Sequence, residues 1–352
     1  MTPNSKKILS GALRWSVAAG LTAALLWILF RKGNFADMLA IIRNGVNYWW
    51  ILAAMGLSVV SHMIRARRWQ LQLRPLGIDP PYMALCCSIF GCYALNIVFP
   101  RLGDIWRCTY IAKRQKAQLT TVLGSMVSDR LADSVTVVVL FFLTLLLANS
   151  AINAFLEKYQ IGRDLVALLY SPWIWIGIAA ACLLLWGAYR IWRGRPFVVR
   201  LRRWCAELWQ GFASVITMKQ RGLFILLTAL LWGCYYFQLY LAFFAFPFTR
   251  ELCSQSALGF GLAPCLVTFV LSSIAMGIPS NGGLGPWNIA VMFGLAVYGV
   301  GDAQGTAFSM LQWSGQTVML ILLGLFTIAY ILISRRSGQP DTSQRTASSV
   351  SE

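Results

Sequence analysis

Long apolar segments, each near the length needed to cross a lipid bilayer, restrict the fold of this chain more than any other feature. A transmembrane helix needs roughly 20 such residues, and six segments approach or exceed that length: Leu9–Phe30, Tyr48–Ile64, Val122–Ala148, Trp173–Trp192, Leu223–Phe246 and Thr306–Ile333. Hydrophobic residues make up 58% of the chain, above the roughly 45–50% that is usual in soluble domains. The sequence therefore predicts an all-α polytopic membrane protein.

The transmembrane domain is expected to take up nearly the whole chain, between two short terminal segments. Leu9–Phe30 is followed at once by two basic residues and by no small-residue cleavage site, so we expect an uncleaved first span rather than a signal peptide. We assign residues 1–8 to a cytoplasmic N-terminus and residues 9–334 to the transmembrane domain. Residues 335–352 are rich in Ser, Thr and Gln, and we expect them to form a disordered tail.

One apolar region is interrupted by helix-breaking residues. Residues 277–286 read G-I-P-S-N-G-G-L-G-P, in which six of ten residues are Gly or Pro. A helix does not continue through glycine and proline at this density. Broken backbone in lipid needs protein or a water-filled cavity to satisfy its polar groups. A second, weaker break lies near Pro100, and a pair of broken helical elements is typical of transporters.

The distribution of basic residues predicts how these breaks enter the membrane. If Met83–Pro100 enters and leaves on the cytoplasmic side and Pro264–Val300 dips in from the other side, six full spans and two cytoplasmic termini remain. The cytoplasmic segments then carry 23 Lys and Arg residues and the outer segments six, against 19 and ten at best if every apolar run crosses. Cytoplasmic loops carry an excess of positive charge. The sequence therefore favours two re-entrant elements in the cell inner membrane, an eight-helix-like arrangement that suggests an inverted repeat.

Polar residues beside the first break form the first candidate site, which comprises Asn96, Pro100, Arg101, Gly103, Asp104 and Arg107. The proline ends the incoming helix, and Gly103 is expected to permit the turn. Asp104 can pair with Arg107 at i, i+3 on one face of the next helix. Guanidinium groups beside a helix N-terminus can bind phosphate. An ordinary cytoplasmic loop with interfacial arginines is the alternative interpretation.

The second candidate site is the charged cluster Asp129, Arg130 and Asp133 inside an apolar run. Ionisable groups at membrane depth are costly, so they usually pair with one another and face the interior of the helix bundle. Arg130 and Asp133 share a helix face, as do Asp129 and Asp133. The cluster is expected to act as a structural clamp, a headgroup contact or part of a proton relay. It would be merely interfacial if the helix began later, near Leu131.

The third candidate site is the glycine-rich break itself, with the residues Asn281, Gly282, Gly283, Gly285 and Asn288. Exposed N–H groups of a glycine-rich turn at a helix start can cradle an anion. Gln312 and Gln316 lie on one face of a later helix and suit the lining of a cavity, although interhelical hydrogen bonding would explain them as well.

Other classes of function find little support in the sequence. The net charge of +18 falls mostly in loops beside spans, which indicates membrane orientation and anionic lipid rather than nucleic acid. The nine cysteines show no C-x-x-C pair, and His62 is the only histidine, placed by the sequence at the end of a span. Zinc sites and Ser-His-Asp triads therefore lack their components. We expect no metal or cofactor.

These motifs resemble the flippase-like transmembrane region of the lysylphosphatidylglycerol synthase family over about residues 10–335. The family shows R…R-W, then N…P-x-R-x-G-E-x-x-R, then E-R-x-x-D, and finally P-x-x-G-G-x-G-x-x-E. The counterparts in this chain are Arg65…Arg68-Trp69; Asn96…Pro100-Arg101-Leu102-Gly103-Asp104…Arg107; Asp129-Arg130…Asp133; and Pro279…Gly282-Gly283-Leu284-Gly285…Asn288. Asp104 and Asp129 replace glutamates, and Asn288 replaces a carboxylate.

The resemblance implies the lipid-handling part of that family, because the sequence carries no soluble aminoacyl-transfer domain. We therefore expect a protein that binds and flips an anionic phospholipid or a lipid-linked headgroup, and that is not an enzyme. Its partners would be membrane lipids, and its oligomeric state is left open. Two alternatives remain: a non-transporting envelope-assembly partner, and a membrane-embedded transferase that acts on a lipid-linked donor with Asp129 or Asp133 as general base.

Overall fold

The computed structural model of the chain describes residues 35–43, 45–148, 219–255, 261–278 and 280–337, with four single residues between 176 and 190. Every regular element in these ranges is a helix. The helices are α2 (Phe35–Arg43), α3 (Tyr48–Leu73), η1 (Arg74–Leu76), α4 (Tyr82–Val98), α5 (Leu102–Gln115), α6 (Leu119–Leu147), α11 (Arg221–Phe243), α12 (Pro247–Gln255), α13 (Leu262–Ala275), η2 (Asn281–Gly283), α14 (Pro286–Ala296) and α15 (Asp302–Ser337). The all-α prediction is confirmed.

Four helices of the described residues are long and apolar enough to cross a membrane: Tyr48–Leu76, Leu119–Leu147, Arg221–Phe243 and Asp302–Ser334. They correspond to four of the six predicted spans. The other two predicted spans, Leu9–Phe30 and Trp173–Trp192, fall outside the described residues apart from four single positions in the second, and so does the N-terminal segment. Of the expected disordered tail, the structure describes only residues 335–337, and these continue helix α15.

The helices at the two breaks are shorter than the hydrocarbon core of a typical bilayer. α4 has 17 residues, α13 has 14 and α14 has 11. At about 1.5 Å per residue these helices are roughly 26, 21 and 17 Å long, against a hydrocarbon core of roughly 30 Å. The length of each element therefore agrees with a helix that stops inside the membrane domain.

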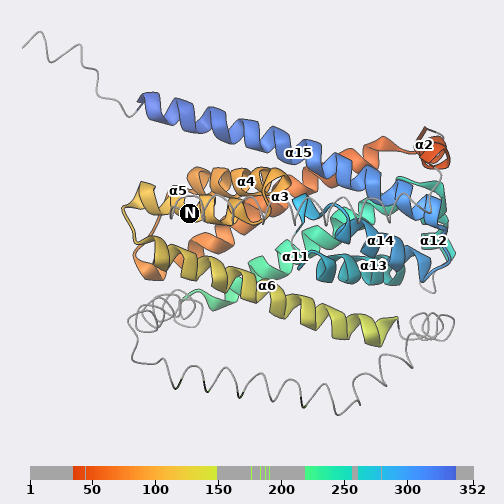
Figure 1. The fold of residues 1–352 in the computed structure, drawn as a ribbon, viewed down its shortest axis with the longest axis horizontal. Coiled ribbons are helices and arrows are strands. Elements are labelled where there is room, and N and C mark those ends of the chain that lie inside the picture. The colour runs from red at the N-terminus through yellow and green to blue at the C-terminus, as the bar shows by residue number, and fades with distance from the viewer. Residues whose placement is uncertain are drawn as a thin grey trace, which may run out of the picture.

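The breaks belong to two halves of the molecule, each with its own hydrophobic core. Figure 1 shows α4 and α5 in one half and α13 and α14 in the other, with α15 and α6 along opposite edges of the view. Buried residues such as Trp69, Leu85 and Ile111 form the core of the first half. Phe243 and Phe308 lie in the core of the second half. The halves are joined by α3, which packs against α4 as well as α11, and by α15, which packs against α4 as well as α14.

The outer faces of the long helices are apolar and exposed. On α6 these side chains include Val138, Val139, Phe142, Leu146 and Leu147, and on α15 they include Ile321, Leu322, Leu325, Ile328 and Leu332. Apolar side chains at such positions would be unfavourable in water but are matched by lipid tails. These faces of α6 and α15 therefore form a lipid-facing surface.

Candidate functional site

The first break turns sharply between α4 and α5. The helix α4 ends at Val98, and α5 begins at Leu102, with Arg101 in the left-handed region at φ 64°. A non-glycine residue there costs roughly 1–2 kcal/mol. The side-chain Oδ1 of Asn96 accepts a hydrogen bond from the N–H of Gly103 at 2.9 Å and so caps the new helix. The predicted proline stop and helix restart are confirmed.

Gly103 was expected to permit the turn, and this prediction is wrong. The turn is made by Arg101, whereas Gly103 lies in the first turn of α5. A Cβ at Gly103 would stand 2.0 Å from the carbonyl oxygen of Cys92 on α4. The glycine is therefore required because the two helices approach each other closely here, and any side chain would push them apart.

The second break keeps the predicted glycine turn. Gly282, Gly283 and Gly285 all have positive φ, between 58° and 93°. The N–H of Gly285 donates to Oδ1 of Asn288 at 3.1 Å. Asn288 is fully buried, so its amide caps the start of α14 from within the protein. This cap uses one N–H group of the anion cradle that the sequence suggested, and Pro286 has no N–H to offer.

The two breaks meet. Nη2 of Arg101 donates to the carbonyl oxygen of Gly277 at 3.0 Å. A Cβ at Gly282 would stand 3.4 Å from the Cα of Ile97. Both breaks open onto one cavity of about 510 Å³, whose lining includes Asn96, Arg101, Gly282 and Gly283 together with Arg130 and Asp133. The two breaks and the α6 cluster, which the sequence offered as three separate candidate sites, therefore line one pocket.

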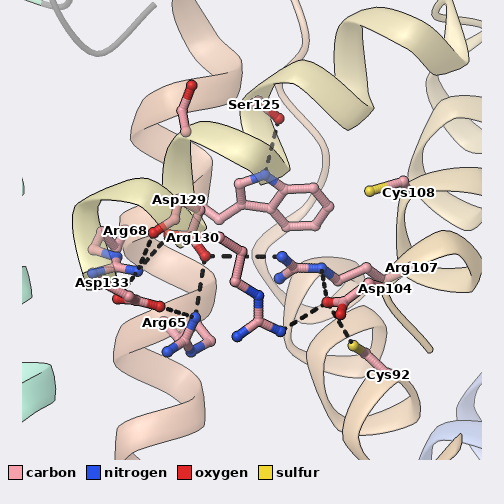
Figure 2. Close-up of polar contacts among 12 residues, drawn as sticks. Arg65, Arg68, Cys92, Asp104, Arg107, Cys108, Ser125, Asp129, Arg130 and Asp133 are labelled. Atoms are coloured by element: carbon pink, nitrogen blue, oxygen red, sulfur yellow. Dashed lines mark hydrogen bonds and ion pairs between the residues drawn. The ribbon is translucent and has the colours of Figure 1, made fainter. Parts of the chain in front are cut away.

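A buried network of ion pairs lies beside this cavity (Figure 2). Arg65 Nη1 lies 3.2 Å from Asp129 Oδ2 and 3.0 Å from Asp133 Oδ2. Arg68 Nη2 lies 2.6 Å from Asp129 Oδ1 and 2.8 Å from Asp133 Oδ1. Two arginines of α3 therefore bridge two carboxylates of α6. Arg65 also donates through Nε to the hydroxyl of Tyr235 at 3.1 Å.

This network corrects the predicted pairing of Arg130. Nη2 of Arg130 donates to Oδ1 of Asp104 at 2.8 Å, and it thereby ties α6 to the first turn of α5. Asp129 and Asp133 share a helix face as predicted, but they turn to α3 instead of to Arg130. The cluster lies well inside α6, which begins at Leu119, so a helix start near Leu131 is wrong.

Arg107 completes the network. Its Nε lies 3.6 Å from Asp104 Oδ1, which confirms the predicted i, i+3 pair, and its Nη2 lies 3.8 Å from Asp129 Oδ2. The guanidinium carbon stands 4.7 Å from the centre of the Trp69 ring, whose Nε1 donates to Ser125 at 3.0 Å. Arg107 is fully buried. It is a structural cation of the network and does not reach the cavity.

The network carries an excess of positive charge. Four guanidinium groups, those of Arg65, Arg68, Arg107 and Arg130, face three carboxylates, those of Asp104, Asp129 and Asp133. The side chain of Arg130 is 37% exposed. One of its nitrogens binds Asp104, and the others make no hydrogen bond to a described residue. Arg101, exposed at the cavity, adds a further positive charge.

The structure divides the predicted site residues into two groups. Seven line the cavity: Asn96, Arg101, Asp104, Arg130, Asp133, Gly282 and Gly283. Seven do not belong to the lining, and instead shape the breaks or the network: Pro100, Gly103, Arg107, Asp129, Asn281, Gly285 and Asn288. Gln312 and Gln316 both line the cavity as predicted, and Gln316 also bonds Gln238 and Ser58 on other helices.

Sequence reasoning about the sites missed several lining residues, among them Arg65, Tyr93, Trp232 and Tyr235. The R-x-x-R-W motif was the available signal for the α3 arginines. His62 also lines the cavity, in the middle of α3 and not at a span end as expected.

One family of known proteins matches the chain over most of its length. The family model described as "Lysylphosphatidylglycerol synthase TM region" matches residues 15–324. No curated protein matches the chain. Within the described ranges, no group of three or more His, Cys, Asp or Glu side chains is placed to hold a metal ion.

Proposed function

We propose, from the premise that the chain belongs to the lysylphosphatidylglycerol synthase TM region family, that it binds an anionic phospholipid or lipid-linked headgroup in the cavity and moves it across the cytoplasmic membrane. The observation that carries this proposal is the meeting of two helical breaks at one cavity with an excess of arginines. Arg101 and Arg130 both line it and have guanidinium donors to offer to phosphate oxygens.

The proposed topology places the two breaks on opposite sides of the membrane. The short lengths of α4, α13 and α14 support re-entrant elements. Arg65, Arg68 and Arg107 lie in the buried network, so they no longer count among cytoplasmic loop charges. The remaining bias is 20 cytoplasmic against six outer basic residues, which keeps the same orientation. Alternating exposure of the cavity to the two sides would then carry the headgroup across.

The two alternatives make different demands on the same residues. A transferase would need a general base at the cavity. Asp129 is fully buried, and Asp133 binds both Arg65 and Arg68, so these carboxylates are better suited to holding arginines than to taking protons. An envelope-assembly partner would need no lipid at the cavity, and the positively charged lining favours a lipid ligand.

Lipid translocation by the purified full chain in proteoliposomes tests the proposal. Fluorescent phosphatidylglycerol and phosphatidylinositol would be followed separately by chemical quenching of the outer leaflet. We expect the protein to accelerate translocation and Arg130→Ala to slow it about tenfold, the equivalent of about 1.4 kcal/mol. Arg130→Lys should recover only part of the rate, because lysine cannot form bidentate phosphate contacts.

Arg114→Ala is the matched control, since Arg114 is exposed near the end of α5 and is not part of the cavity lining. It should keep the wild-type rate. If vesicles with the wild-type protein translocate both lipids no faster than protein-free vesicles, transport of these lipids is excluded. Formation of a product from a lipid-linked donor would instead support the transferase.

A further inference from the structure

Beyond its charged residues, the cavity is lined by neutral polar and aromatic side chains. They include Ser272, Ser273, Gln312, Gln316, Trp287 and Trp313. Trp313 donates its indole N–H to the carbonyl oxygen of Gly282 at 3.0 Å, so its ring is fixed against the second break. The lining therefore combines charged side chains with neutral polar and aromatic ones.

Two polar groups in the lining are buried without a partner among the described residues. Gln312 is 7% exposed, and its Oε1 accepts no hydrogen bond there. His62 is 3% exposed, and both of its ring nitrogens are likewise unpaired. The His62 ring is packed against Tyr93, with 4.6 Å between ring centres. Buried polar groups without partners are costly, so both residues point to a ligand that supplies hydrogen bonds.

The chemistry of these groups restricts the ligand. The Oε1 atom of Gln312 only accepts hydrogen bonds, and an ionised phosphodiester has no donor to give it. A neutral imidazole has one donor and one acceptor, which a hydroxyl group can match on both sides. An amine would also donate, but Arg65, Arg101 and Arg130 outnumber Asp104 and Asp133 in the lining. The charge balance therefore favours hydroxyl groups over an ammonium group.

The size of the cavity restricts the ligand further. A volume of about 510 Å³ lies within the roughly 300–1,000 Å³ range of small-molecule pockets, which is more space than a phosphate group alone requires. The tryptophan rings of the lining offer large, rigid apolar surfaces. The C–H groups of a sugar or cyclitol ring can pack on such surfaces while its hydroxyls reach polar neighbours.

We infer, on the basis of the proposed function, that the headgroup is a polyhydroxylated ring joined to the lipid through a phosphodiester. The phosphate binds at Arg101 and Arg130, and the ring hydroxyls bind at His62 and Gln312. A glycosyl or cyclitol phospholipid has this chemistry.

Competitive binding to the purified full chain, read by native mass spectrometry, tests the inference. Phosphatidylinositol and phosphatidylmethanol form a matched pair, because both are singly charged phosphodiesters and only the first has ring hydroxyls. We expect the wild type to bind phosphatidylinositol about tenfold more tightly, since several hydrogen bonds distinguish the two lipids. Gln312→Met and His62→Phe should each reduce that preference and leave phosphatidylmethanol binding unchanged.

Gln304→Met is the control, because Gln304 lies on the same helix as Gln312 but is not part of the cavity lining. It should keep the wild-type preference. Equal wild-type affinity for the two lipids overturns the inference and leaves the proposed function standing. Preference for phosphatidylethanolamine over both would identify an amine ligand and would also overturn it. If neither anionic lipid binds above phosphatidylcholine, the proposed function itself fails.

Discussion

At the break between α4 and α5, charged side chains hold the structure together, whereas at the break between α13 and α14 glycine backbone does so. The first break is fixed by Arg130 and Arg107 on Asp104 and by the close approach at Gly103. The second break has three glycines at positive φ and no charged side chain between Gly277 and Pro286.

The two breaks nevertheless share one device. An asparagine side chain caps the start of the outgoing helix in each: Asn96 accepts from Gly103, and Asn288 accepts from Gly285. Asn96 belongs to the incoming helix and Asn288 to the outgoing one. The common need is to satisfy N–H groups at a helix start inside an apolar domain. The two breaks therefore meet this need in different settings, the first among charged side chains and the second in a glycine-rich turn.

The largest expected effect concerns the charged half. Arg68 is fully buried and bridges Asp129 to Asp133. Arg68→Met should destabilise the protein by about 3–5 kcal/mol, because it leaves two neighbouring carboxylates with a single shared partner. Thermal unfolding in detergent, followed by tryptophan fluorescence, measures this loss.

The matched control is Arg74→Met, whose side chain is 40% exposed and pairs with Asp79. An exposed pair contributes only about 0–1 kcal/mol, so this variant should unfold near the wild-type temperature. If Arg68→Met does the same, the ion-pair network does not hold the first half together.

A smaller effect on stability is expected from replacing a glycine at each break. Gly103→Ala should cost about 1–3 kcal/mol or more, because the new Cβ would collide with the backbone of Cys92. Gly282→Ala should cost about 1–2 kcal/mol, since its Cβ meets only ordinary contacts and the cost arises from φ of 58°. Denaturation midpoints compare the two variants.

Gly56→Ala provides the reference for this comparison, since a Cβ added at Gly56 on α3 would have no atom within 4 Å. It should be neutral or stabilising. If Gly282→Ala lowers the stability much more than Gly103→Ala does, the comparison of the two breaks is wrong.

The smallest expected effect concerns which side of the membrane a residue faces, as measured by its reaction with a thiol reagent. No change in stability is expected. Lys113, near the end of α5, and Arg250, on α12, are both exposed. In a background without native cysteines, Arg250→Cys should react with an impermeant thiol reagent on intact cells, because its helix is proposed to face outward. Lys113→Cys should react only after permeabilisation. Labelling of both from one side would exclude the opposite entry of the two breaks.

The sequence predicted the long described helices and the Asp104–Arg107 pair, but it did not predict the charge pairs between distant residues. Apolar length and glycine or proline stops are local signals, so the ends of α4, α6 and α13 fall within a few residues of expectation. The pairing of Arg130 with Asp104 joins residues 26 positions apart, and the pairing of Arg68 with Asp129 joins residues 61 apart. Periodicity along one helix cannot reveal such partners.

The residues of the candidate site could be predicted where they lie on one face of a single helix or within a single break. Gln312 and Gln316 were expected to line a cavity because they are one helical turn apart, and they do so. Gly103 was misjudged because a glycine required for close approach cannot be distinguished in sequence from a glycine required for a turn. The lining residues Tyr93 and Trp232 carried no signal, since aromatic residues inside spans are common and mostly pack in the core.

The central claim is that the charged and neutral breaks form one site, and a disulfide across them tests it most directly. Ile97 Cβ lies 3.9 Å from the position of a Cβ at Gly282, within the roughly 3.5–4.5 Å range of disulfides. In a background without native cysteines, we expect Ile97→Cys with Gly282→Cys to cross-link on mild oxidation and to stop lipid translocation until a reductant is added. Each single variant should remain active. A double variant that forms no cross-link, or that translocates lipid at an unchanged rate when cross-linked, would contradict the account.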